Sequence, residues 1–215
     1  MPYYFAKFNR ENKIILRVNT RIYFGREKPN SRDGKCLGLV ILKNPGSANP
    51  TNIGEWSEIQ IGNDKALPWI ANVYSTVLKE LNLVIDENSY LRVCNLLAIR
   101  EPNIDLAIKS LNENQYFVEK IEYKVLPFVF FAWGWEPELN PFRTTYLKSL
   151  TKFRNVSFFV KYDFSNYANK FQIVDSLPQI GDKVKHTQGM PQNLIIDKIK
   201  EILLKNQSET KSRLL

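Results

Sequence analysis

The stretch Leu37-Gly38-Leu39-Val40-Ile41-Leu42, followed at once by Lys43-Asn44-Pro45-Gly46-Ser47, is the strongest indication of the fold in this chain. A short, continuous apolar run is typical of a strand that is buried on both faces of a parallel sheet. Two further apolar runs, Tyr90–Cys94 and Val125–Ala132, also end in turns, at Asn95 and at Trp133-Gly134-Trp135. Because an open parallel sheet builds its ligand site outside the carboxyl ends of its strands, we expect these three turns to meet at one pocket.

Strand-like and helical segments alternate along the rest of the chain. Apolar residues recur at helical spacing in 64–82, Ile104–Lys120, Pro141–Phe153 and Pro191–Lys205. With Asn155–Tyr162 as a fourth strand, the order predicts a three-layer α/β/α fold with a central, mostly parallel four-stranded sheet. The part-alternating pattern of residues 1–24 predicts an N-terminal β-hairpin, with strands Tyr3–Phe8 and Lys13–Phe24 and a turn over Asn9–Asn12.

The chain of 215 residues is of the length of one domain, which we place at residues 1–205. It contains a basic hairpin and loop over 1–35, a polar loop over Asn44–Asn63 and a flexible tail over 206–215. No run approaches the ~20 apolar residues that span a bilayer, and the first residues lack the pattern of a signal peptide. We therefore expect a cytoplasmic monomer without a membrane partner.

The net charge of +8 is unevenly distributed. Residues 1–36 carry nine Lys/Arg and three Asp/Glu, a net +6, and residues 183–215 carry seven and three, a net +4. The middle, 37–182, is close to neutral at −2. Basic flanks around a near-neutral pocket favour binding of a phosphate backbone, although solvated lysine-rich faces would give the same count. The candidate DNA contacts are Arg17, Arg21, Arg100, Lys183 and Lys185.

The composition excludes several common chemistries. Two cysteines, Cys36 and Cys94, and one histidine, His186, are too few for a cysteine- or histidine-rich metal centre, so we expect no metal and no cofactor. The signatures GxSxG, HExxH, Walker A and GxGxxG are all missing from the sequence. The usual hydrolase, kinase and dinucleotide-binding interpretations therefore lose their support.

The side chains of the three turns suggest a polar site. Asn44 can orient a water or a substrate group, and Pro45 and Gly46 shape a turn whose amides face outwards. Asn95 interrupts an apolar stretch, and its amide offers a donor and an acceptor together, which suits the edge of a base. Trp133 and Trp135 can wall a pocket or stack on a base. Each feature alone also fits an ordinary turn, a backbone-bonded asparagine or a core aromatic.

Taken together, these motifs resemble the uracil-DNA glycosylase superfamily, and more closely an uncharacterised bacterial and phage family of unknown function that shares its fold. The stretch Leu39–Ala48 is similar to the water-positioning loop written Gly-Ile-Asn-Pro-Gly in mismatch-type uracil glycosylases. Leu91–Arg100 is similar to the strand whose terminal asparagine reads the flipped uracil, and Phe128–Gly134 to the apolar strand that ends in Trp-Gly. The sequence departs from the pattern at Leu42, at Lys43 and in the last motif, His186–Asn193, which lacks His-Pro-Ser.

The resemblance implies a DNA glycosylase that flips a uracil-like or modified base and leaves an abasic site, in DNA repair or phage defence. It implies that Asn44 places a water, that Asn95 reads the base, and that Asn193 or His186 stabilises the leaving base. Lys43, Pro45, Gly46, Ser47, Trp133 and Trp135 complete the implied substrate site. A glutamate of the following loop, Glu55 or Glu58, is a further candidate base, or else simply solvated.

Two other functions fit the same residues. A nucleic-acid-binding module without catalysis would keep the pocket but form no abasic sites. An enzyme acting on a free nucleoside or nucleotide would need no basic flanks and would bind DNA weakly. Because one fold hosts many activities, the motifs support the fold more strongly than the function.

Overall fold

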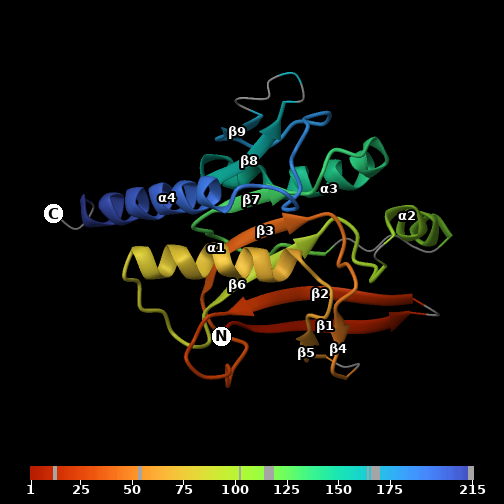
Figure 1. Ribbon diagram of the computed structural model, residues 1–215, viewed down its shortest axis with the longest axis horizontal. Coiled ribbons are helices and arrows are strands. Elements are labelled where there is room, and N and C mark those ends of the chain that lie inside the picture. Colours follow the sequence, from red (N-terminus) through yellow and green to blue (C-terminus); the bar gives the residue numbers. More distant parts are fainter. Residues whose placement is uncertain are drawn as a thin grey trace.

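A computed structural model describes residues 1–11, 14–52, 55–101, 103–113, 119–163, 165 and 170–212. Within these residues nine strands form one mixed sheet (Figure 1). The strands are β1 (Tyr3–Glu11), β2 (Ile14–Tyr23), β3 (Cys36–Leu42), β4 (Asn49–Pro50), β5 (Ser57–Gln60), β6 (Tyr90–Asn95), β7 (Val129–Ala132), β8 (Ser157–Tyr162) and β9 (Phe171–Val174). The helices are α1 (Ala66–Glu80), α2 (Ile104–Glu113), α3 (Asn140–Leu150) and α4 (Gln192–Ser212), with 3-10 turns at Pro137–Leu139 and Thr151–Val156.

The strand order is β4-β5-β1-β2-β6-β3-β7-β8-β9. The four strands β6, β3, β7 and β8 are parallel, and every other pairing is antiparallel. The predicted alternation of strands and helices is thus confirmed, but the prediction of a four-stranded sheet was wrong. The hairpin β1–β2 is part of the same sheet, because β2 pairs with β6. The short strands β4, β5 and β9 have no long apolar run from which they could have been predicted.

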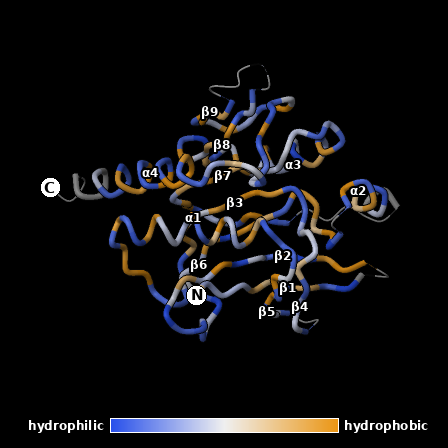
Figure 2. The backbone as a smooth tube through the Cα atoms, in the orientation of Figure 1, coloured by the Kyte–Doolittle hydropathy of each residue, from blue (hydrophilic) through white to orange (hydrophobic). Residues whose placement is uncertain are grey.

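Helices cover both faces of the sheet. On one face α1 and α4 pack together and bury Ile70, Val77, Ile195 and Ile199 against the strands. On the other face α2 and α3 contribute Ala107, Phe142, Tyr146 and Leu150. The strand β3 shows how the layers are joined, because its alternate residues Val40 and Leu42 face the first core and Leu39 and Ile41 face the second. Figure 2 shows β3 as a mainly apolar strand in the middle of the sheet.

Several boundaries differ from those predicted. The strand β1 continues to Glu11, through most of the expected turn. The last residue of that turn, 12, and the first residue of the expected second strand, 13, lie outside the described residues. The helix predicted over Ile104–Lys120 ends at Glu113 before the undescribed residues 114–118, and residues 119 and 120 are not helical. The strand expected from Val125 begins only at Val129. The last helix runs to Ser212, well into the segment expected to be a flexible tail, and residues 213–215 are not described.

The direction of the chain connections changes at β3, in the middle of the sheet. From β3 the chain moves to β6 on one side of β3 and then returns to β7 on the other side. The helices that follow β3 and β6, namely α1 and α2, accordingly lie on opposite faces. Side chains after β3 and β7 therefore meet at a topological switch point, where open α/β sheets commonly bind their ligands. None of the helices within the described residues is long and apolar enough to cross a membrane.

Candidate functional site

A pocket of about 470 Å³ opens at the carboxyl end of β3, a volume typical of small-molecule sites. Three segments line it: the loop after β3, the start of α1, and the loop before α4. Their lining residues are Asn44, Pro45, Gly46, Ser47, Asn63, Asp64, Lys65, Ala66, Trp69, His186, Thr187, Gln188 and Gly189. Of the predicted site residues, the structure thus gathers Asn44, Pro45, Gly46, Ser47 and His186 around one cavity.

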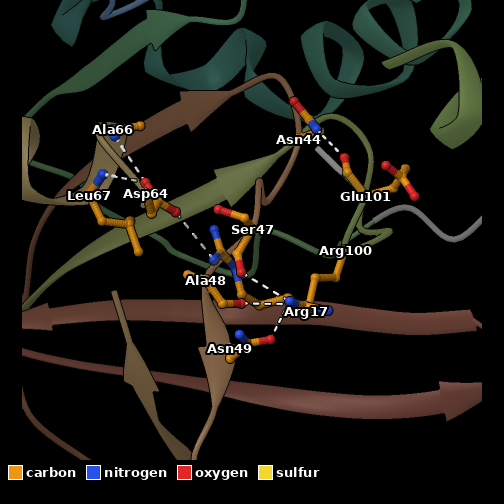
Figure 3. Close-up of polar contacts among 10 residues, drawn as sticks. All are labelled: Arg17, Asn44, Ser47, Ala48, Asn49, Asp64, Ala66, Leu67, Arg100 and Glu101. Carbon is orange, nitrogen blue, oxygen red and sulfur yellow. Dashed lines mark hydrogen bonds and ion pairs between the residues drawn. The ribbon is translucent and has the colours of Figure 1, made fainter. Parts of the chain in front are cut away.

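The amide of Asn44 is held from one side. Its Nδ2 donates a hydrogen bond to the backbone carbonyl of Glu101, on the loop after β6 (Figure 3). This bond fixes the orientation of the side chain and leaves Oδ1 as an acceptor for a water or a ligand. Gly46, two residues later, has φ +67°, a conformation that a residue with a side chain adopts only under strain. The turn predicted after β3 is therefore observed, with Gly46 at a position that favours glycine.

Arg100 forms hydrogen bonds with the next residues of the loop after β3. Its Nε donates to the carbonyl of Ala48 at 2.9 Å, and its Nη2 donates to the carbonyl of Ser47 at 2.9 Å and to Oδ1 of Asn49 (Figure 3). Three bonds from one guanidinium hold Ser47 and its neighbours at the pocket edge. Arg100 was predicted to contact DNA, but its Nε and Nη2 donate hydrogen bonds within the protein.

A buried ion pair lies at the pocket wall. Oδ1 of Asp64 accepts hydrogen bonds from the amides of Ala66 and Leu67 at 2.9 and 3.1 Å and so caps α1, while Oδ2 lies 3.6 Å from Nη1 of Arg17 (Figure 3). Arg17 is only 1% exposed, and burial lowers its pKa to about 10, against the opposing attraction of Asp64. Within the described residues, Nε and Nη1 of Arg17 form no hydrogen bond. The prediction that Arg17 contacts DNA was wrong, because this guanidinium is inside the protein.

His186, on the loop before α4, lines the pocket as a neutral imidazole. Burial is the main cause that lowers its pKa to about 4, and the ammonium groups of Lys43 and Lys185 lower it further against the attraction of Glu136. The amide of Gln188 donates to Nδ1 at 3.4 Å. The ring proton therefore resides on Nε2, so the imidazole can donate a hydrogen bond at neutral pH without carrying charge.

Lys43 and Glu136 join the carboxyl ends of β3 and β7. Nζ of Lys43 lies 2.6 Å from Oε1 of Glu136. Burial is the largest single influence and raises the pKa of Glu136. The hydrogen bond from Lys43, the backbone amide of Glu136 and the positive charges of Lys43 and Arg143 together outweigh it, so the pKa lies below its usual value. Arg143 stands behind the pair, with Nη2 3.9 Å from the other carboxylate oxygen. Lys43 was predicted to bind substrate; here its ammonium group is engaged by Glu136.

Asn95 is the last residue of β6 and is 1% exposed. Its backbone carbonyl accepts a 2.8 Å hydrogen bond from the hydroxyl of Tyr146. Within the described residues, neither Oδ1 nor Nδ2 of its side chain has a hydrogen-bond partner. Asn95 pairs with Leu42 across the strands, directly before the pocket loop, but it does not belong to the pocket lining. An unsatisfied buried amide costs roughly 1–3 kcal/mol, so its retention here calls for a reason.

The two predicted tryptophans lie outside the pocket lining. Trp133 is 1% exposed and packs in the core, edge-on to Phe131 with ring centroids 4.8 Å apart. Trp135 is 37% exposed and stacks on Tyr162 at 6.1 Å, with Nζ of Lys185 5.8 Å from its ring centroid. Trp133 is thus a core aromatic, the alternative left open by the sequence.

Further predicted residues lie away from the pocket. Asn193 is exposed in the first turn of α4 and is not part of the lining, so of the two candidates for stabilising the leaving base only His186 lines the pocket. Lys183 is exposed, and Lys185 is half-buried over two rings, with its pKa lowered by burial and by Lys170. Arg21 is half-buried against Trp56 and Tyr90.

The carboxylate of the pocket was missed by the sequence analysis. Glu55 and Glu58, the candidate bases, form ion pairs with Lys7 and Lys28 at 2.8 Å outside the pocket. Asp64 is the carboxylate that lines the pocket. A signal was present, because an aspartate just before an apolar helical run is a typical N-cap, and a helix that follows a strand begins at the edge where ligands bind.

Comparison with known proteins adds no assignment, since no family model, no curated protein and no solved structure matches this chain. Among the described residues, no group of three or more histidine, cysteine, aspartate or glutamate side chains is placed to hold a metal ion. The pocket therefore has to be interpreted from its own side chains.

Proposed function

We propose that this protein hydrolyses N-glycosidic bonds, as a DNA glycosylase-like enzyme acting on a uracil-like or modified base. The observation that carries the proposal is the meeting of three complementary groups in one pocket: the amide of Asn44, the carboxylate of Asp64 and the neutral imidazole of His186. Cleavage of such a bond needs a positioned water, compensation for positive charge on the sugar, and a donor to the departing base. The pocket offers one group for each.

Asn44 and Asp64 serve the sugar side of the reaction. Oδ1 of Asn44 accepts a hydrogen bond from the attacking water, since its Nδ2 is already bound to Glu101. The carboxylate of Asp64 faces the oxocarbenium-like carbon and accepts the proton that the water loses on adding to it. A carboxylate thus supplies the basicity that an asparagine lacks.

His186 serves the base side. As the glycosidic C–N bond breaks, its electron pair stays with the base, and the Nε2–H of His186 donates a hydrogen bond to the developing anion. The base then takes a proton from solvent. A pKa of about 4 keeps the imidazole neutral, so the reaction depends on hydrogen bonding and not on an imidazolium. We assign the reading of the base to Asn95. The support is that its side-chain amide has no hydrogen-bond partner among the described residues.

The test is an assay on end-labelled single- and double-stranded DNA that carries uracil, mismatched or phage-type modified bases, with hot alkali revealing abasic sites. We expect cleavage at one class of base that is lost in Asn44→Ala and in Asp64→Asn. The second variant is assayed where circular dichroism shows it folded, because it leaves the buried Arg17 without its counter-ion. The matched controls are Asn193→Ala, an exposed asparagine, and Asp197→Asn, an exposed aspartate. Equal activity in Asn44→Ala and Asn193→Ala would contradict the proposal. Salt-sensitive binding without cleavage would favour a binding module.

One observation favours a second candidate, an enzyme that acts on a free nucleoside or nucleotide. Two of the five predicted DNA contacts, Arg17 and Arg100, use their guanidinium groups inside the protein. The same purified enzyme should therefore be assayed on free nucleosides by chromatography of the released base. Release from nucleosides at a rate equal to that from DNA would replace the DNA proposal with this one.

A further inference from the structure

A second polar surface lies on the sheet, at the opposite end of the parallel strands from the pocket. Two rows of side chains cross the strands there, the first with Tyr3, Tyr23 and Tyr90 and the second with Phe5, Arg21 and Arg92. Both rows face away from α1, because Ile22 and Leu91, which lie between them, belong to the core under α1. The aromatic cluster around Tyr23 contains no residue from any described helix. Two arginines, Arg21 and Arg32, cover it instead.

The two guanidinium groups are stacked on aromatic rings. Cζ of Arg21 lies 3.9 Å from the ring centroid of Tyr90 and 4.6 Å from that of Trp56. Cζ of Arg32 lies 4.0 Å from the ring centroid of Phe5 and 5.8 Å from that of Trp56. Stacking fixes the plane of a guanidinium group while its N–H edge stays available for an oxyanion.

Several of these N–H groups are available. Nε of Arg21 donates to Asn19 and Nη1 to the carbonyl of Arg32, whereas Nη2 has no hydrogen bond within the described residues. Nη1 of Arg32 donates to two carbonyls of its own loop, and its Nε and Nη2 have no such bond in that same part of the chain. None of these unbonded nitrogens is among the buried atoms without a partner, so they are open to solvent.

The charges of this surface are incompletely balanced. Within the described residues, no carboxylate forms an ion pair with Arg21 or Arg32, although both contact the same tryptophan. At the rim, Lys7 pairs with Glu55 and Lys28 with Glu58. Two adjacent cations without a counter-charge repel each other, and an anion bound between them removes that repulsion.

We propose that this arginine–aromatic surface, formed by Arg21, Arg32, Trp56, Lys7 and Lys28, binds the phosphodiester backbone of a single-stranded nucleic acid. Paired guanidinium forks match phosphate oxygens, and residues 1–36 carry a net +6. A lipid surface fits less well, because Trp56 is half-buried and none of the large apolar side chains exposed among the described residues lies on this surface. The proposal does not depend on the chemistry proposed for the pocket.

The test measures binding of a fluorescently labelled single-stranded oligothymidylate by anisotropy over a range of salt concentrations. Arg21→Gln/Arg32→Gln should weaken binding at least tenfold at low salt. Because each phosphate contact to a single strand contributes about 0.7 to the slope of log K against log salt, the slope should fall by about 1.4. Arg26→Gln, an exposed arginine of the neighbouring loop, is the matched control and should change little.

Two further variants test the proposal even if Arg21→Gln/Arg32→Gln does not fold. Arg21→Lys/Arg32→Lys keeps the charge and the ring contact and should weaken binding about threefold. Glu55→Gln/Glu58→Gln removes the rim carboxylates and should tighten binding about threefold. Binding of the oligonucleotide that is equal in Arg21→Gln/Arg32→Gln and Arg26→Gln would overturn the proposal. Binding of inorganic phosphate alone, with no oligonucleotide bound, would overturn it as well. Neither the affinity for the oligonucleotide nor its salt dependence requires that the pocket be catalytically active.

Discussion

Nζ of Lys43 lies 2.6 Å from Oε1 of Glu136, and this ion pair bridges the carboxyl ends of β3 and β7 at the topological switch point of the sheet. The pair stands beside His186, whose pKa is affected by both charges. Lys43 directly follows β3, and Glu136 lies a few residues after the end of β7. The charge that follows one strand is therefore balanced by the charge that follows its neighbour.

Replacing Lys43 by methionine should raise the pKa of His186 from about 4 towards its ordinary value of 6.5. The reason is that the ammonium group opposes the imidazolium, while the burial that causes most of the shift remains. Glu136→Gln should lower the pKa further, since the carboxylate attracts the imidazolium. Nuclear magnetic resonance of the imidazole protons measures the pKa of His186 in each variant. The signals need no further assignment, because His186 is the only histidine of the chain. Lys65→Met, also in the pocket lining, serves as the control; a shift equal to that of Lys43→Met would contradict the assignment.

The stability of the protein should decrease between pH 7 and pH 5. His186 has a folded pKa of about 4 and an unfolded value near 6.5, so the unfolded chain binds the proton first. The free energy of unfolding therefore falls as the pH drops below 6.5, by up to about 2 kcal/mol at pH 5. Urea unfolding at pH 7, 6 and 5 checks this. The variant His186→Gln should show a flatter curve over the same range, and an unchanged slope would rule out His186 as the cause.

The sequence predicts the parallel centre of the fold because Cys36–Leu42 has no charged side chain and Tyr90–Cys94 has only one, that of Arg92. A strand that is buried on both faces needs a nearly continuous run of apolar residues, and such a run can be recognised in the sequence. The short strands towards the margin of the sheet have no such run. Ser57–Gln60 alternates between buried and exposed positions over only four residues, and Asn49–Pro50 forms two residues of ladder. Their strand state is imposed by pairing with β1 and with each other, which no local pattern reveals.

The candidate site was predicted where its residues follow a buried strand, as Asn44 does. It was missed where a distant contact decides the role of a residue. Arg17 looks like any basic strand residue, and only the fold brings it to Asp64, 47 positions later, at 3.6 Å. Charge counted along the chain could not separate this buried arginine from those at the surface, such as Arg26.

Removing the charge of Asp64 should destabilise the protein strongly. Asp64→Asn retains a side-chain oxygen that can cap α1, but it leaves Arg17 charged and buried without its counter-ion, at a cost of about 3 kcal/mol or more. Arg17→Met alone should also destabilise, by leaving a carboxylate at 5% side-chain exposure unpaired. In the double variant Arg17→Met/Asp64→Asn the two losses should be less than additive by more than about 1 kcal/mol. Chemical denaturation of the four proteins gives the coupling, and additivity would show that the two side chains do not act as a pair.

Asn95→Leu should increase stability while it removes function. Both polar atoms of the Asn95 side chain are buried without a partner among the described residues, so an apolar side chain of similar size avoids the cost of desolvating them, about 1–2 kcal/mol. If the amide is retained to read a base, the same change should abolish cleavage of the preferred substrate. Denaturation and the glycosylase assay measure the two effects side by side. The exposed Asn193→Leu controls for a general effect of the substitution and should change neither quantity appreciably. A stabilised Asn95→Leu enzyme with full activity would show that the buried amide has no part in substrate recognition, and a destabilised one would show that it is satisfied within the folded protein.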